Sequence, residues 1–388
     1  MPPPPLSVPA RAWLVASLRA IGRREPSPLP GADLDWDAVI AAADAEDLLP
    51  ALAHGLAARQ WARVPAGARA RLTREASASR ARHLVMTAEL GRLLRRCRSE
   101  GVAAIVLKGP ALAETVYPAP SLRPCSDLDL LVRPADRLRM DALVRDLGHR
   151  RVPDEHSWDF DVVFDGATVY AAPSGVRVDL HWSLLTEPRF AWNCEAQTAV
   201  WERAAALSVA GEPALGLGLE DLVLHLAIHL AVHHSLAGLR RYWDVALVLE
   251  RRGGDLDWDA LLARAERWRV RRALFFVLLG ARSTFGAPVP SRILAALRPT
   301  GPRALWLAAL VRAEDARRLE QLEYLVPLLL IDRASDLGGP LRQGLWPPAD
   351  WMRARYGSRR ARYLTHVRRL GGLIGNAAGA LVGAPGRR

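Results

Sequence analysis

The stretch that decides the fold is Leu107-Lys-Gly-Pro110, followed after a short loop by Asp127-Leu-Asp-Leu-Leu-Val132. Residues 102–107 form a continuous apolar run that ends in lysine, glycine and proline, which is typical of a buried strand leading into a helix. In the second run acids and leucines alternate, and a strand would place both acids on one face. The pattern therefore predicts two strands of one sheet, with two carboxylates pointing the same way.

A third acid, Asp179, lies in Val176-Arg-Val-Asp-Leu-His-Trp182, which has the same strand pattern. Carboxylates side by side in an apolar strand repel each other and lose hydration, and a cation between them relieves both effects. Magnesium suits such a place because it takes oxygen ligands, and manganese is the alternative metal. Two metal ions can stabilise both oxygens of an in-line phosphoryl displacement. We therefore expect Asp127, Asp129 and Asp179 to be catalytic metal ligands.

Residues that suit a phosphate lie close to these acids in the sequence. Lys108 and Gly109 end the first strand and open a helix, whose N-terminal N–H groups favour an anion. Arg123 lies on the loop that leads into the second strand. Lys108 is also the only lysine among 53 basic residues, and a compact ammonium differs chemically from a planar guanidinium. The sequence therefore predicts that Lys108, Gly109 and Arg123 bind the nucleotide, although no P-loop motif is present.

Four further polar residues are candidates for lining the substrate or supporting the acids. His181 follows the third acid by two positions and should share its strand face. His225 and His229 lie four apart on one helical stretch, but no H-E-x-x-H motif accompanies them. We therefore favour a packing or substrate-lining role for these histidines over metal binding. Asp244 stands in an apolar helical stretch, where it either pairs with the neighbouring arginines or reaches the site.

The composition and the spacing of apolar residues change along the chain and divide it into five parts. Apolar residues recur at helical spacing before and after a central segment of short strands, among them strands expected at 158–164 and 168–171. We expect an α+β fold, in which a mixed sheet with α/β connections is flanked by N-terminal and C-terminal helical regions. The expected parts are a disordered proline-rich leader and linker (1–31), a helical region (32–100), the α/β core (101–185), a C-terminal helical domain (186–375) and a flexible tail (376–388).

Composition excludes several classes of protein. Half of the 388 residues are hydrophobic and a quarter are charged, as in ordinary globular proteins. The three cysteines show no C-x-x-C spacing, so neither a disulfide framework nor a zinc site is expected. No signal peptide and no apolar run of about 20 residues is visible, which favours a cytoplasmic protein without a membrane partner. The net charge of +12 comes from scattered arginines, so nucleic acid is not the favoured partner.

Several segments together resemble the uncharacterised nucleotidyltransferase family of the DNA polymerase β-like superfamily. The resemblance implies the minimal nucleotidyltransferase fold, the use of an NTP and magnesium, and metal-ligand roles for the three aspartates. Better-known superfamily members carry a Gly-Ser pair where this chain has Lys108-Gly109. The segments that carry the resemblance are Leu107-Lys-Gly-Pro-Ala-Leu-Ala113, Tyr117-Pro118, Arg123-Pro-Cys-Ser-Asp-Leu-Asp-Leu-Leu-Val132, Val178-Asp-Leu-His-Trp182, Glu220-Asp-Leu222, His225-Leu-Ala-Ile-His229, Leu239-Arg-Arg-Tyr-Trp-Asp-Val-Ala246, Trp346-Pro-Pro-Ala-Asp-Trp351 and Arg355-Tyr-Gly357.

Together these features predict a magnesium-dependent nucleotidyltransferase. It would move an NMP group from an NTP, with ATP as the expected donor, to a hydroxyl of a small molecule, peptide or protein. Two alternatives stay open at this point. One is a degenerate protein that binds a nucleotide without turnover, which the missing Gly-Ser pair favours. The other is a transferase that modifies RNA, using the positive charge to hold its acceptor.

Overall fold

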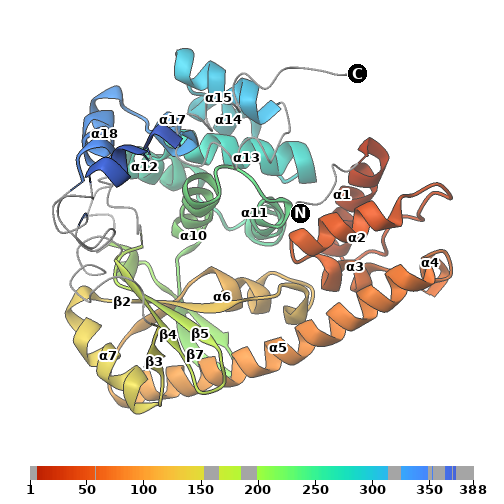
Figure 1. Ribbon diagram of the computed structural model, residues 1–388, viewed down its shortest axis with the longest axis horizontal. Coiled ribbons are helices and arrows are strands. Elements are labelled where there is room, and N and C mark those ends of the chain that lie inside the picture. The colour runs from red at the N-terminus through yellow and green to blue at the C-terminus, as the bar shows by residue number, and fades with distance from the viewer. Residues whose placement is uncertain are drawn as a thin grey trace.

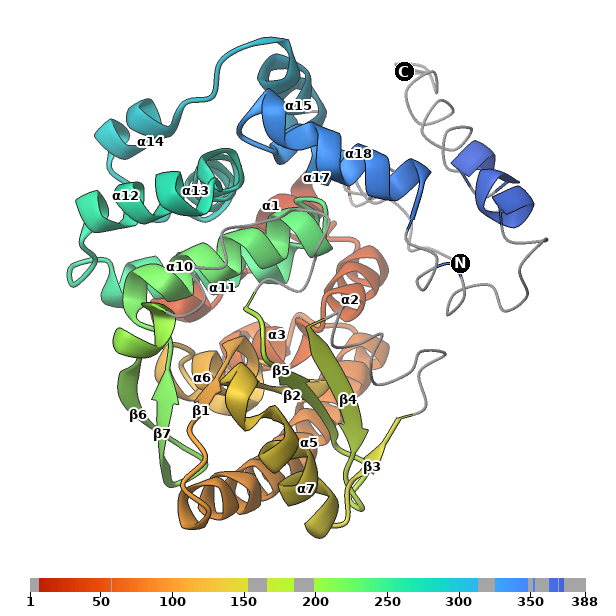
Figure 2. The ribbon, with the colours of Figure 1, turned by 90° about the vertical axis from the view of Figure 1, so that its left-hand side faces the viewer.

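A computed structural model describes residues 7–56, 58–152, 166–184, 199–312, 325–347, 352, 363–368 and 370–372. The chain forms one seven-stranded sheet with helices on both faces (Figures 1 and 2). The expected α+β fold with a mixed sheet is therefore confirmed. The strand expected at 158–164 and most of the segment 348–362 lie outside the described residues.

The N-terminal helices are α1 (Val8–Gly22), α2 (Trp36–Ala45), α3 (Leu49–Gly55), α4 (Ala58–Trp61) and α5 (Ala66–Ser99). The expectation that residues 1–31 form a disordered leader and linker is wrong for α1. Ser7 caps this helix by accepting a hydrogen bond from Ala10 N, and a proline in the first turn costs no internal hydrogen bond. Leu14 and Leu18 are fully buried in the main core. The proline-rich composition therefore concealed an amphipathic helix with an apolar face.

The sheet has the strand order β3-β4-β5-β2-β1-β7-β6. Its strands and the elements between them are β1 (Ala104–Val106), α6 (Lys108–Thr115), η1 (Pro120–Leu122), β2 (Asp127–Val132), η2 (Pro134–Asp136), α7 (Arg137–Asp146), β3 (Arg150–Arg151), β4 (Ala167–Ala171), β5 (Arg177–His181), β6 (Ala205–Val209) and β7 (Glu212–Gly216). Strand β2 pairs antiparallel with β1 and parallel with β5. The two strands that carry the acids are therefore direct neighbours at the centre of the sheet.

Two strands of this sheet lie beyond residue 185, where the sequence pattern predicted helix alone. Strands β6 and β7 form a hairpin whose turn residues Ala210 and Gly211 both have positive φ, 56° and 71°. Such a turn matches the right-handed twist of paired strands. Strand β7 then pairs parallel with β1 through Ile105 and Leu215. The predicted core boundary at 185 is therefore wrong, because a long-range pairing brings the hairpin into the sheet.

The two faces of the sheet belong to two different hydrophobic cores. Leu128 and Leu130 of β2 belong to the smaller core with residues of α5 and α7, whereas Leu131 belongs to the larger core, which contains residues of the N-terminal and C-terminal helices. Figure 2 shows α5 at the lower end of the view and the C-terminal helices α10 and α11 above the strands. Because strand residues alternate, the acids of β2 lie on the face opposite Leu128, toward the C-terminal helices.

The C-terminal helices begin directly after β7. They are α10 (Leu219–Ile228), the π-helical turn η4 (His229–His233), α11 (Leu239–Arg252), α12 (Trp258–Trp268), α13 (Arg271–Phe285), α14 (Ser291–Leu297), α15 (Pro302–Arg312), α17 (Val326–Leu330), η5 (Ala334–Leu337) and α18 (Gly338–Leu345). Helices α10 and α11 lie next to the sheet (Figures 1 and 2). In the described part of the chain, no helix is both long and apolar enough to cross a bilayer.

Candidate active site

The three predicted acids come together on one face of the central strands. Asp129 and Asp179 are register partners on the parallel strands β2 and β5, and Asp127 stands two positions before Asp129. Asp129 is almost fully buried, while Asp127 and Asp179 are partly exposed. Strand alternation therefore places the acids as expected, with the buried leucines on the opposite face.

The carboxylate of Asp129 contacts two neighbouring side chains, Lys108 and His181. Its Oδ1 lies 3.2 Å from Lys108 Nζ and 3.0 Å from His181 Nε2. Burial acts to raise the pKa of Asp129, but the charge of Lys108 and the hydrogen bond from His181 outweigh it and hold this pKa far below the usual value. The carboxylate is therefore ionised, and the structure joins Lys108 and His181 to the acid as part of one site.

Asp179 has a different environment. Its Oδ1 is buried and has no hydrogen-bond partner among the residues that the structure describes. Burial, and next the negative charges of Asp127 and Asp129, raise the pKa of Asp179 to about 6. A buried carboxylate oxygen without a partner beside two further acids is a place where a cation is strongly favoured.

The donor chemistry of this cluster fits magnesium, but the acids do not form a ready-made cage. Among the described residues, no group of three or more His, Cys, Asp or Glu side chains is arranged to hold a metal ion. In the structure the Lys108 ammonium lies against Asp129 instead. Magnesium commonly binds through one or two carboxylates together with water and substrate phosphates. An incomplete set of protein ligands is therefore compatible with a metal that arrives with a nucleotide.

A row of histidines lies behind Lys108. His229 Nε2 is 3.1 Å from Lys108 Nζ, and because an ammonium only donates, this nitrogen accepts. Burial, and next the charge of Lys108, lower the pKa of His229 well below its usual value, so the ring is neutral. His225 is buried one turn earlier, with its pKa lowered to about 3 by burial and by Lys108. The two histidines expected to line the site therefore reach it.

Arg123 and Asp244 form a buried ion pair with each other. Arg123 Nε and Nη2 donate to the two carboxylate oxygens of Asp244 at 2.8 and 2.9 Å, and Tyr117 Oη donates to Oδ1 at 2.6 Å. Burial favours the neutral acid, but Arg123 outweighs it and lowers the pKa of Asp244. The expectation that Arg123 contacts the nucleotide is not supported, because its guanidinium is committed to Asp244. Asp244 likewise pairs with Arg123 and not with its neighbouring arginines.

The cluster of Arg123, Asp244 and Tyr117 ties the loop before β2 to helix α11. Arg123 and Asp244 are 121 positions apart, and Tyr117 and Asp244 are 127 apart. Tyr117 is absent from the predicted site because no local pattern signals so distant a partner. An acid in an apolar helical stretch was the available signal for Asp244, since such an acid needs a buried partner.

Gly109 provides a close approach between α6 and the loop before β2. A Cβ at this position would lie 3.3 Å from Cys125 Sγ and 3.6 Å from Arg123 Nη1. The residue is buried, so a larger side chain would push the loop away. Gly109 therefore has a packing role in addition to the backbone contact with phosphate that the sequence predicts.

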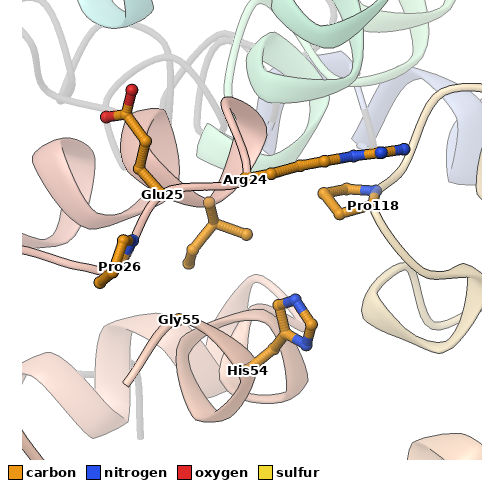
Figure 3. A pocket seen from close by; sticks show the side chains of 7 residues that line it. Arg24, Glu25, Pro26, His54, Gly55 and Pro118 are labelled. Atoms are coloured by element: carbon orange, nitrogen blue, oxygen red, sulfur yellow. The ribbon is translucent and has the colours of Figure 1, made fainter. Parts of the chain in front are cut away.

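A separate pocket lies among the N-terminal helices (Figure 3). It has a volume of about 380 Å³ and is lined by the end of α1 and the segment that follows it, by α3 and by Pro118 after α6. Figure 3 shows Arg24 extending toward Pro118, with His54 facing them across the opening. None of the residues that line it belongs to the acid cluster. We therefore place the candidate active site at the acids, where the charged side chains converge.

Fold and site together define an α+β protein with an acid cluster on a mixed sheet, beside a lysine at a helix N-terminus. The sequence pattern of the family described as uncharacterised nucleotidyltransferases matches residues 32–286. The chain belongs to this family. A solved structure, the antibiotic-resistance factor ANT(2'')-Ia, is similar at 13% identity and a TM-score of 0.33, covering 53% of this chain and 95% of that one. No curated protein matches the chain.

Proposed function

We propose that the protein transfers an NMP group from an NTP, ATP being the expected donor, to a hydroxyl group of a small molecule, peptide or protein. The observation that carries this proposal is the buried, unpartnered Oδ1 of Asp179 beside Asp127 and Asp129. Asp127, Asp129 and Asp179 would hold a magnesium ion there, which would neutralise charge at the reacting phosphate. Membership of the nucleotidyltransferase family supports the reaction class.

The reaction forms a bond between the acceptor oxygen and the α-phosphorus, and it breaks the bond from that phosphorus to the oxygen bridging to the β-phosphate. The electron pair of the broken bond leaves with pyrophosphate. In this proposal Asp179 orients the acceptor hydroxyl and takes its proton. Most of the rate enhancement in such chemistry comes from positioning and electrostatics. The role of the rigid strands β2 and β5 is therefore to hold the acids in register.

Lys108 and His181 keep Asp129 ionised and oriented for this reaction. Lys108 stands at the first position of α6, so that its ammonium and the N-terminal N–H groups of the helix can meet the same phosphate. His181 hydrogen-bonds Asp129 from the neighbouring strand and fixes the rotamer of the carboxylate. In the nucleotide complex, Lys108 is expected to share its charge between Asp129 and the phosphates.

The test is transfer of label from α-labelled NTP. The protein is incubated with magnesium, each of the four NTPs in turn, and extract from its own source, and labelled products are separated by size and chemistry. We expect Asp127→Asn and Asp129→Asn to abolish magnesium-dependent release of pyrophosphate. An exposed acid, Asp255→Asn, is the control and should retain the wild-type rate.

The outcomes separate the proposal from its rivals. An unaffected rate in both aspartate variants would end it. NTP binding without pyrophosphate release in the wild-type protein would select a nucleotide-binding protein without turnover. Labelling of RNA ends, together with a steep loss of RNA affinity on adding salt, would select an RNA-modifying transferase.

A further inference from the structure

We propose that Lys108, His229, His234 and Arg241 form a subsite for the outer phosphates of the nucleotide and for the pyrophosphate that leaves. This inference rests on the proposed function, because it assigns a place to one part of that substrate. It goes beyond it by adding His229, His234 and Arg241 of the C-terminal helical region to the phosphate contact of Lys108. These four residues are called the basic wall below.

The basic wall begins at the acids and leads outward. Lys108 contacts both Asp129 and His229. The His229 ring lies 4.7 Å from that of His234 and 5.4 Å from that of His233. His229 and His234 are partly exposed and His233 is exposed. The histidines therefore connect the buried acid cluster to solvent.

The charges that dominate at the wall are positive. After burial, the strongest influence on His234 is the charge of Arg241, followed by His233, Lys108 and Arg240, and its pKa is lowered to about 3. At His229 the charge of Lys108 comes next after burial, and protonation of any neighbouring histidine would lower the pKa of this ring further. No carboxylate is among the leading influences at either ring. A polyanion placed here would therefore be attracted by Lys108 and Arg241. It would also favour protonation of His229 and His234, which the neighbouring positive charges now oppose.

Among the residues that the structure describes, Arg241 is held only by a long ion pair. Its nearest carboxylate is Glu46, with Nη1 and Oε2 3.9 Å apart, at the outer limit of an ion pair. Arg240, next to it, is bound to Asp47 at 3.3 Å and to Pro124 O at 3.0 Å. Arg240 therefore docks the N-terminal helices and the loop before β2, while Arg241 keeps donors for a ligand.

The backbone that presents the wall is unusual in two ways. Helix α10 ends in the π-helical turn His229–His233, and such turns are frequent at functional sites. Ser235 and Leu236, neither of them glycine, then have positive φ of 50° and 63°, which costs energy that the fold must compensate. Gly238, at φ 109°, has no Cβ, and one built there would lie 2.4 Å from Arg241 Nη1. The segment thus brings His234 and Arg241 to one place.

A buried histidine nitrogen lies at the inner end of the basic wall. His225 is 6% exposed, and its buried Nε2 has no hydrogen-bond partner within the described part of the chain. The charges of Lys108 and Asp129 both act on this ring, so it lies at the junction of wall and acids. A buried nitrogen without a partner is costly in a finished core and is expected where a ligand or its water completes the site.

The experiment measures binding of tripolyphosphate and of AMP in the presence of magnesium by calorimetry. We expect the wild-type protein to bind tripolyphosphate, and His234→Glu and Arg241→Ala to weaken that binding by tenfold or more. AMP binding should change less than twofold. Arg252→Ala is the matched control, since this arginine lies at the other end of α11 and pairs with exposed Asp255. His234→Gln and Arg241→Lys, with thermal melts, provide milder variants if the stronger ones fail to fold.

Two results would overturn the inference: no tripolyphosphate binding by the wild-type protein, or equal binding by the wild-type and wall variants. Equal losses of tripolyphosphate and AMP binding would also overturn it, because they would indicate a structural role. The inference and the proposed function can fail separately. If NTP turnover is found and the wall variants leave its KM unchanged, only the wall is wrong. If the variants lose tripolyphosphate binding but no NTP is consumed, only the transfer reaction is wrong.

Discussion

Replacing Asp244 with alanine should destabilise the protein strongly, because it leaves Arg123 as an unpaired buried charge. The two side chains are only 9% and 4% exposed and share two hydrogen bonds of 2.8 and 2.9 Å. Removing one partner from a buried ion pair costs about 3–5 kcal/mol. The Tyr117 hydroxyl also loses its acceptor, which places the expected loss in the upper part of that range.

Urea unfolding followed by tryptophan fluorescence measures this loss as a change in the free energy of unfolding. The matched control is Asp255→Ala, which removes an ion pair with Arg252 of similar length, 3.0 Å, whose side chains are 50% and 68% exposed. An exposed pair of this kind contributes less than about 1 kcal/mol. The double variant Arg123→Met with Asp244→Ala should lose less than the sum of the single variants, because neither charge is then left alone. A loss in Asp244→Ala no larger than that in Asp255→Ala would refute the reasoning.

The same pair predicts a pH dependence of stability. The pKa of Asp244 is lowered in the folded protein, whereas in the unfolded chain it is about 3.9. A lowered folded pKa contributes stability above the unfolded pKa and loses it as the pH falls toward the folded one. The difference between wild type and Asp244→Ala should therefore be constant from neutral pH to about 5 and narrow below about 4. A difference that narrows near neutral pH would contradict this assignment.

Three further changes test the packing. Leu14→Ala should cost about 2–5 kcal/mol in urea unfolding, because Leu14 is 1% exposed in α1. The 83% exposed Val8 is its control, and Val8→Ala should stay within about 0.5 kcal/mol; equal effects would mean that α1 does not belong to the core. Gly109→Ala brings a Cβ to 3.3 Å from Cys125 Sγ and should cost about 1 kcal/mol by crowding, and Cys125→Ala in the same chain should recover this loss in the same assay. Asp35→Ala removes the cap of α2, whose Oδ1 accepts from Ala38 N at 2.9 Å, and should cost about 0.5–2 kcal/mol; an unchanged unfolding midpoint would count against the cap.

Local pattern was sufficient for the centre of the site. The alternation in residues 127–132 placed both acids on one strand face, and the same rule placed Asp179 and His181 together on β5. Leu128 and Leu130 enter the opposite core, as alternation requires. These inferences succeed because the direction of a side chain in a strand depends only on neighbouring dihedral angles.

Local pattern failed where the outcome depended on a distant partner. Proline-rich composition around α1 predicted disorder, yet Leu14 and Leu18 are buried by contacts with other helices. The hairpin of β6 and β7 was missed because its place in the sheet depends on β1, more than a hundred positions earlier. Propensity is a weak guide wherever such tertiary pairing decides the structure.

The sequence by itself therefore determined the acid-bearing strands, the lysine at the start of α6 and the class of fold. Only the tertiary structure decided that Arg123 belongs to Asp244 and that Lys108 belongs to Asp129 and His229. The physical reason is that an arginine on a loop can satisfy its charge with any carboxylate or phosphate within reach. The packing of helix α11 against the loop before β2 decides which partner the arginine meets. Local sequence rules do not predict this packing, because the two segments are far apart in the chain.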